Sequence, residues 1–150
     1  MTIAKKDVIP EGHPAFDRLP LARFIEKDVQ CAYQGTSAYK VALMMVEGLF
    51  GAVPIVDDHR RLVGIVSEHD LLASLERGEK WGERCARDVM TPNPYSVLSD
   101  MTVGTLIHVL LKSNLIRVPV VDAHGVLIGI ISRRDVLRDY LNYNLEPQQG

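Results

Sequence analysis

The chain has 150 residues, of which 47% are hydrophobic, enough to build a core in one compact domain or in two closely packed halves. A net charge of −2 provides no overall positive field for a polyanion, so nucleic acid is not an expected partner. Two isolated cysteines cannot form a disulfide framework or a thiolate metal site, and no apolar run approaches the roughly 20 residues of a membrane span. We therefore expect a soluble, cytoplasmic protein with no membrane partner.

The first half of the chain predicts one β-α-β-β-α unit after a proline-containing extension, residues 1–20. A short strand is expected near Cys31 to Tyr33, and residues 37–49 have the three- and four-residue apolar spacing of a helix with one buried stripe. The runs VPIV and LVGIV flank the polar turn DDHRR and predict a hairpin. A closing helix follows Ser67, and we place this unit at residues 21–77.

The second half repeats this order after a linker, residues 78–85. A short strand is expected near Tyr95 to Leu98, then a helix over 102–114, a hairpin around DAHG and a closing helix after Ser132. This unit spans residues 86–142, and residues 143–150 form a loose tail.

Sliding the chain against itself by 65 residues places residues 53–72 on 118–137 without a gap, and eleven of these twenty pairs are identical. Self-similarity at a fixed period indicates two copies of one structural unit. The expected fold class is therefore α+β, with two β-α-β-β-α repeats.

Both repeats place the pattern S-x-x-D where a strand passes into a helix, as Ser67 to Asp70 and Ser132 to Asp135. On a structural interpretation, the serine hydroxyl and the acid cap the helix reciprocally, which is worth about 1 kcal/mol. On a functional interpretation, the helix N-terminus holds a phosphate and the aspartate accepts ribose hydroxyls. Gly64 and Gly129 would then let a flat base approach the strand. The two interpretations do not exclude each other.

Two tandem units with h-P-V-V-D, a hairpin and G-h-h-S-x-x-D resemble a pair of CBS domains, the cystathionine β-synthase type repeats that associate into a Bateman module. The segment RDVMTPNPYSVLSDMTV, residues 87–103, is typical of the start of such a unit. The resemblance implies that the repeats pack about a pseudo-twofold axis and leave two clefts. In many members these clefts bind AMP, ADP, ATP or S-adenosylmethionine.

Carried over by position, the resemblance implies two unequal sites. Positive charge in the first turn of a helix opposes the helix dipole by about 0.3–1 kcal/mol per residue, and a bound anion would relieve this cost. The first cleft would use Ser132, Asp135, Gly51, Ala52, Val53 and Pro54, with Arg117, Arg133 and Arg134 as phosphate ligands; a part for Asp28 and Gln30 stays open. The second cleft would use Ser67, Asp70, Thr91, Asn93, Tyr95, Leu115 and Ile116, beside Glu68 and His69, so a polyphosphate would meet repulsion. Three alternatives stay open for it: an empty cleft, an uncharged or cationic adenosine compound, or a cleft that becomes more receptive when His69 is protonated.

The resulting hypothesis is a regulatory protein that senses an adenine nucleotide and signals to an unidentified regulated protein. No nucleophile, base and orienting acid come together, so we expect no enzyme activity, no required cofactor and no metal site. The helix faces that contain Val41, Met44, Met45, Leu106 and Val109 are expected to pair with another copy in a homodimer. The alternatives are a ligand-free assembly scaffold with vestigial clefts and, ranked last, single-stranded nucleic-acid binding through the arginine patch.

Overall fold

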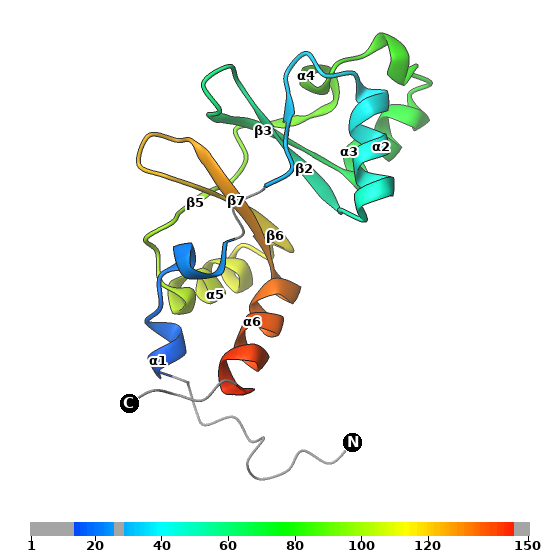
Figure 1. Cartoon of the computed structure of the whole chain (residues 1–150). Helices are drawn as coiled ribbons and strands as arrows, with labels where there is room; N and C mark the ends of the chain where they lie inside the picture. The colour runs from blue at the N-terminus through cyan, green and yellow to red at the C-terminus, as the bar shows by residue number, and fades with distance from the viewer. Residues whose placement is uncertain (1–13, 26–28, 146–150) are drawn as a thin grey trace, which may run out of the picture.

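The computed structural model describes residues 14–25 and 29–145 and contains two sheets that lie side by side, each covered by helices (Figure 1). In the first sheet the strand order is β1 (Ala32–Tyr33), β2 (Ala52–Val56), β3 (Leu62–Ser67) and β4 (Thr91–Pro92). In the second sheet the order is β5 (Val97–Leu98), β6 (Arg117–Val121) and β7 (Leu127–Ser132).

Each sheet has its own helices (Figure 1). The first carries α2 (Ala38–Gly48), α3 (Glu68–Glu76), the 3₁₀ helix η2 (Trp81–Glu83) and α4 (Ala86–Val89). The second carries α1 (Pro14–Asp17), the 3₁₀ helix η1 (Leu21–Phe24), α5 (Val103–Lys112) and α6 (Arg133–Leu145). The predicted α+β class and the two β-α-β-β-α repeats are confirmed.

The two hairpins meet at their turns through a reciprocal pair of backbone hydrogen bonds. The Leu62 N–H donates to the Gly125 carbonyl over 3.0 Å, and the Leu127 N–H donates to the Arg60 carbonyl over 2.9 Å. These two bonds are related by the same 65-residue shift as the sequence repeat. The repeats are therefore joined about a pseudo-twofold axis, as the resemblance implied.

Each hairpin turn is closed by an aspartate that begins it. Asp57 accepts the backbone N–H groups of His59 and Arg61, and Asp122 accepts those of His124 and Val126 in the second repeat. These backbone donors hold the pKa of both carboxyl groups below the ordinary value of 3.8. The two histidines therefore act here through their backbone, as turn residues.

Part of the expected N-terminal extension completes the core of the second repeat. The Phe16 side chain is 1% exposed, and its ring centroid lies 5.1 Å from that of Tyr140 on α6 and 5.5 Å from that of Phe24. The Leu21 N–H donates to the Met101 carbonyl over 2.9 Å. The segment 14–25 thus leaves the repeat with which it is contiguous and packs on the other one (Figure 1).

The helix stripes that we expected to pair with another copy are mostly buried within the chain. Val41 and Leu106 are 0% exposed and Met45 is 5% exposed, each within the core of its own repeat. Met44 and Val109 pack against the same two cores. Val41, Met45 and Leu106 are therefore not available to a second copy, because each sheet uses them to cover itself, and the homodimer itself stays a prediction.

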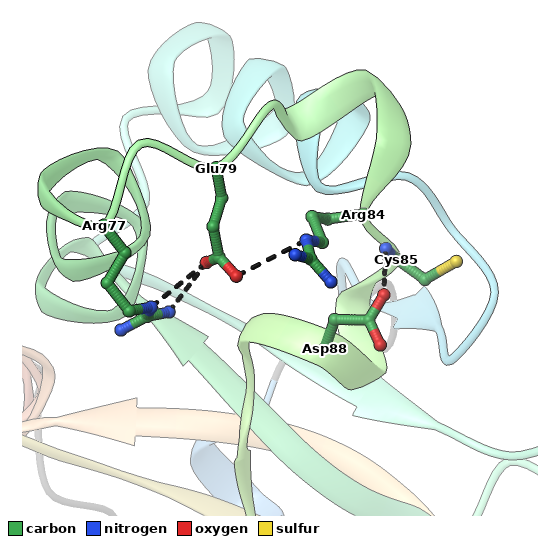
Figure 2. A network of polar contacts seen from close by, with 5 residues as sticks. All are labelled: Arg77, Glu79, Arg84, Cys85 and Asp88. Carbon is green, nitrogen blue, oxygen red and sulfur yellow. Dashed lines mark hydrogen bonds and ion pairs between the residues drawn. The ribbon is translucent and has the colours of Figure 1, made fainter.

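The linker is ordered by charged contacts at its surface (Figure 2). The Glu79 carboxylate lies between Arg77, at 2.8 Å, and Arg84, at 3.4 Å, and the Asp88 carboxylate accepts the Cys85 N–H at the start of α4. These contacts connect the end of α3 to the start of the second repeat.

Candidate functional site

The two S-x-x-D corners have the predicted capping geometry. Asp135 Oδ2 accepts the Ser132 N–H over 2.7 Å, and Ser132 Oγ accepts the Asp135 N–H over 3.0 Å. The corresponding distances between Ser67 and Asp70 are 2.8 and 3.2 Å. The structural interpretation is therefore confirmed at both corners, and what distinguishes them is the surroundings of the second carboxylate oxygen.

That second oxygen has different neighbours in the two repeats. Asp70 Oδ1 accepts a hydrogen bond from the Thr91 hydroxyl over 3.1 Å. Asp135 Oδ1 lies 3.1 Å from Arg138 Nη1, and the Asp135 side chain is 30% exposed at the border of two adjoining hollows. Asp135 thus lines both of these hollows, whereas Asp70 lines neither.

We call the first of these hollows the arginine hollow. It has a volume of about 500 Å³ and lies between the start of β2, the start of β6 and the start of α6. Seven of the nine residues predicted for the first cleft line it: Gly51, Ala52, Arg117, Ser132, Arg133, Arg134 and Asp135. The fold thus brings together the glycine-alanine pair of one repeat and the arginines of the other.

The second, which we call the strand hollow, has a volume of about 400 Å³. Most of its lining is apolar, from Phe24, Ile25, Val29, Phe50, Ala52, Gly129, Ile130 and Ile131, with Gln30, Asp135 and Arg138 as the polar side chains. It shares Phe50, Ala52, Ile130 and Asp135 with the arginine hollow. The two hollows together form one composite site, the second-repeat cleft, with an apolar part and a cationic part on either side of Asp135.

Arg117 reaches across the boundary between the repeats. A Cβ atom added to Gly51 would lie 2.3 Å from Arg117 Nη2, so the guanidinium occupies the space that the glycine leaves free. Neither Arg117 nor Arg134 forms an ion pair with another residue of the described segments. Arg117 at the start of β6 and Arg134 at the start of α6 thus line one hollow with no ion-pair partner among the described residues, and such a pair of guanidinium groups is suited to an anion.

Arg133 is largely committed to the fold. Its Nε donates to the Leu115 carbonyl over 2.6 Å, and its Nη2 lies 3.3 Å from the Leu110 carbonyl and 3.2 Å from Asn114 Oδ1. These acceptors lie at and just beyond the C-terminal end of α5, which is the negative end of its dipole. Arg133 lines the arginine hollow, but its Nε and Nη2 atoms donate hydrogen bonds to residues at the end of α5.

The structure also places the predicted residues of β2 and the glycines that precede the two corners. Val53 and Pro54 line neither hollow, because they lie fully buried within β2. An added Cβ at Gly129 would lie 2.4 Å from Ile25 Cγ2, and one at Gly64 would lie 2.3 Å from Met90 Sδ. Each of these glycines therefore leaves room for a packed side chain. Gly129 also lines the strand hollow, and that the glycines admit a flat base stays a prediction.

The residues predicted for the second cleft are only partly brought together. Ser67, Asp70 and Thr91 form one hydrogen-bonded group. Asn93 and Tyr95 are exposed, and Leu115 packs against the second core. Ile116 lines the arginine hollow instead, because Gly51 and Ile116 occupy equivalent positions about the pseudo-twofold axis. Neither of the two hollows described above reaches Ser67 or Asp70.

Several residues of the strand hollow were missed at the level of sequence. Phe24 and Ile25 come from the segment 14–25, which crosses to the second repeat in a way that the repeat pattern alone does not show, and Val29 lines the same hollow. A signal was present for Ile25, which is equivalent to Met90 under the 65-residue shift and also covers a glycine of the neighbouring strand. Gln30 lines this hollow, whereas Asp28 lies outside the described residues.

Two absences hold for the described residues only. In residues 14–25 and 29–145, no three His, Cys, Asp or Glu side chains are grouped so that they could hold a metal ion. Over the same segments, no helix has the length and apolar character needed to cross a membrane.

Comparison with known proteins identifies relatives over most of the chain. The CBS domain model matches residues 21–77 and 86–142. The chloroplastic CBS domain-containing protein CBSX2 of Arabidopsis thaliana is 30% identical over 77% of this chain and 60% of that protein. The uncharacterized protein MK0525 of Methanopyrus kandleri is 32% identical over 81% of this chain and 64% of that protein. The chain thus spans less than two thirds of the length of these curated relatives.

Solved structures show the same architecture. CBSX2 in complex with AMP superposes with a TM-score of 0.73 at 32% identity, over 83% of this chain and 97% of that one. The CBS domain pair of protein MJ0100, in complex with 5′-methylthioadenosine and S-adenosyl-L-methionine, superposes with a TM-score of 0.72 at 26% identity, over 83% and 98% of the two chains.

Proposed function

The chain belongs to the CBS-domain family, as a tandem pair of CBS domains, and on this premise we propose that it is a regulatory protein that binds one adenine nucleotide in the second-repeat cleft. The observation that carries the proposal is that the apolar strand hollow and the arginine hollow meet at Asp135. A nucleotide needs these three environments in this order: apolar walls for the base, a carboxylate for the ribose and cations for the phosphates. That CBSX2 was crystallised with AMP supports the ligand class.

Each part of the nucleotide has a group in the cleft that fits it. The base would lie among the apolar side chains of the strand hollow, such as Phe50 and Ile130. Asp135 Oδ1 would accept the ribose hydroxyls in exchange for its contact with Arg138. The phosphates would lie in the arginine hollow, against Arg117 and Arg134 and near the N–H groups that begin α6.

The charge of the two corners favours a single ligand per chain. The second-repeat corner carries Arg133 and Arg134, where the first-repeat corner has Glu68 and His69. A polyphosphate would meet the negative charge of Glu68, and Asp70 already accepts the Thr91 hydroxyl. A ligand in the second-repeat cleft touches both repeats, so its binding would favour one relative arrangement of them and would alter the surface that a regulated partner meets.

Isothermal titration calorimetry of the full chain with ATP, ADP, AMP and S-adenosylmethionine tests the proposal. We expect one site per chain, with affinity falling from ATP through ADP to AMP, and with the cationic S-adenosylmethionine weakest, because the arginine hollow attracts negative charge. A micromolar affinity corresponds to about 8 kcal/mol. Saturating ligand at about 100 times the dissociation constant would stabilise the fold by about 2.7 kcal/mol in thermal unfolding. If no compound gives heat or raises the melting temperature, the proposal is wrong and the ligand-free scaffold is the better description.

A further inference from the structure

Arg138 forms an ion pair with the carboxylate that would accept the ribose hydroxyls. Its Nη1 atom lies 3.1 Å from Asp135 Oδ1, and its Nη2 atom lies 3.6 Å from Asp139 Oδ1. Asp135 Oδ2 accepts the Ser132 N–H over 2.7 Å, so Oδ1 is the oxygen that does not serve the helix cap. Arg138 and a bound ribose would therefore use the same carboxylate oxygen.

The guanidinium group of Arg138 lies between the cleft and the exposed side of α6. Arg138 lines the strand hollow together with Asp135. A shallow hollow of about 320 Å³ on the exposed side of α6 is lined by Arg138 and by Arg134, Leu137, Leu141 and Asn142. The Arg138 side chain is 54% exposed, so it can leave Asp135 by a change of rotamer that does not open the core, and Asp139 is a second carboxylate within reach.

The first repeat carries no cation at the position of Arg138. The residue equivalent to Arg138 under the 65-residue shift is Ala73. In that repeat, Asp70 Oδ1 accepts a hydrogen bond from the neutral Thr91 hydroxyl over 3.1 Å. Since both corners form the same helix cap, the cap does not require the arginine. The ion pair between Arg138 and Asp135 is thus a particular feature of the second-repeat cleft.

We propose that Arg138 is a specificity-determining residue of the second-repeat cleft, because it competes with the ribose hydroxyls for Asp135; this inference rests on the proposed function. A ligand with both ribose hydroxyls displaces the guanidinium group, which then pairs with Asp139. A ligand without these hydroxyls leaves Arg138 on Asp135. Arg138 therefore reduces the contribution of the ribose hydroxyls to affinity.

The same exchange connects the cleft to the surface of α6. Because Arg138 also lines the hollow on the exposed side of this helix, its displacement by a ribose moves a positive charge on that surface. Arg134 lines both the arginine hollow and this outer hollow. A nucleotide that engages both arginines thus changes the charge pattern of the exposed side of α6, which is a route by which occupancy of the cleft reaches the surface.

Calorimetric titration of the full chain with ATP and with 2′,3′-dideoxy-ATP, which lacks both ribose hydroxyls, tests the competition. The measured quantity is the ratio of the two dissociation constants, in which effects on the phosphates cancel. Arg138→Ala should raise the preference for ATP by about two- to fivefold, the range expected for an exposed ion pair. Arg77→Ala is the matched control, because Arg77 is also 54% exposed and ion-paired, at 2.8 Å from Glu79, but lines neither hollow of the cleft. Its substitution should leave the preference unchanged.

Nuclear magnetic resonance of the arginine Nε–H groups follows the displacement itself. The signal of Arg138 is assigned as the one that Arg138→Lys removes. It should shift when the wild-type chain is saturated with ATP, and it should shift much less with the dideoxy compound.

An unchanged or reduced preference for ATP in Arg138→Ala would overturn the inference, and so would an Arg138 signal that responds equally to both compounds. If both compounds still bind the wild-type chain in these cases, the proposed nucleotide site stands and only the role of Arg138 is wrong. If neither compound binds the wild-type chain, the proposed function fails, and this inference fails with it.

Discussion

Replacing Arg133 and Arg134 one at a time should separate the stability of the fold from the binding of a nucleotide. The side chains are neighbours at the start of α6, but only Arg133 donates hydrogen bonds to the end of α5. A hydrogen bond that involves a charged group contributes about 1.5–3 kcal/mol. Only the bond to Leu115 is short, and Arg133 is half-buried, so we expect Arg133→Ala to lower the free energy of unfolding by about 2 kcal/mol.

Arg134→Ala should behave differently. Arg134 is exposed and has no ion pair within the described segments, so its removal should change stability by less than about 0.5 kcal/mol. Because the change also removes a positive charge from the first turn of a helix, the sign of any effect should be stabilising. The loss of a charge-assisted phosphate contact should weaken ATP binding by about 10–100-fold, since each factor of ten corresponds to about 1.4 kcal/mol.

Urea unfolding followed by circular dichroism and calorimetric titration with ATP measure the two effects independently. For a chain of this size, the loss in Arg133→Ala corresponds to a melting temperature lower by about 4–8 °C. The assignment would be refuted if Arg133→Ala left the stability unchanged and abolished ATP binding, or if Arg134→Ala unfolded the chain while its remaining folded fraction bound ATP normally.

Three further predictions concern single positions. Asp135→Asn and Asp70→Asn disturb equivalent helix caps, and each should lower the free energy of unfolding by about 1 kcal/mol. Only the change at Asp135 should weaken ATP binding in calorimetry. Equal weakening of ATP binding by both substitutions would contradict a single site. Gly64→Ala should destabilise by about 1–3 kcal/mol in thermal unfolding, because the new methyl would meet Met90 and the Thr91 carbonyl, whereas Gly82→Ala, which adds a methyl in open space, should have little effect. Since the pKa of Asp57 is lowered in the folded state, its carboxylate contributes stability above about pH 3.8, and this stability is lost as the pH falls through the lower folded pKa. In urea unfolding between neutral and acid pH, Asp57→Asn should therefore lose less free energy of unfolding on acidification than the wild type. An equal loss in both proteins would argue against this role.

The architecture was readable from the sequence because the interactions that build each repeat are short in range. Each hairpin forms between strands that are adjacent in the chain, and each cap, at Ser67 and Ser132, joins residues three positions apart. The 65-residue repeat then indicates that these local structures occur twice. The composition of the arginine hollow could be predicted only through the resemblance to CBS domains, whose clefts combine the S-x-x-D corner of one repeat with the strand start of the other.

The tertiary structure alone decided which side chains are available to a ligand. The segment with Phe16 and Ile25 crosses to the second repeat, Ile25 fills the space beside Gly129, and Arg133 turns toward α5. Each of these contacts joins elements that are far apart in the chain. Such contacts depend on how side chains fill the space between elements and on which hydrogen-bond partners are within reach. Because both depend on the folded arrangement, the order of residue types along the sequence does not predict them directly.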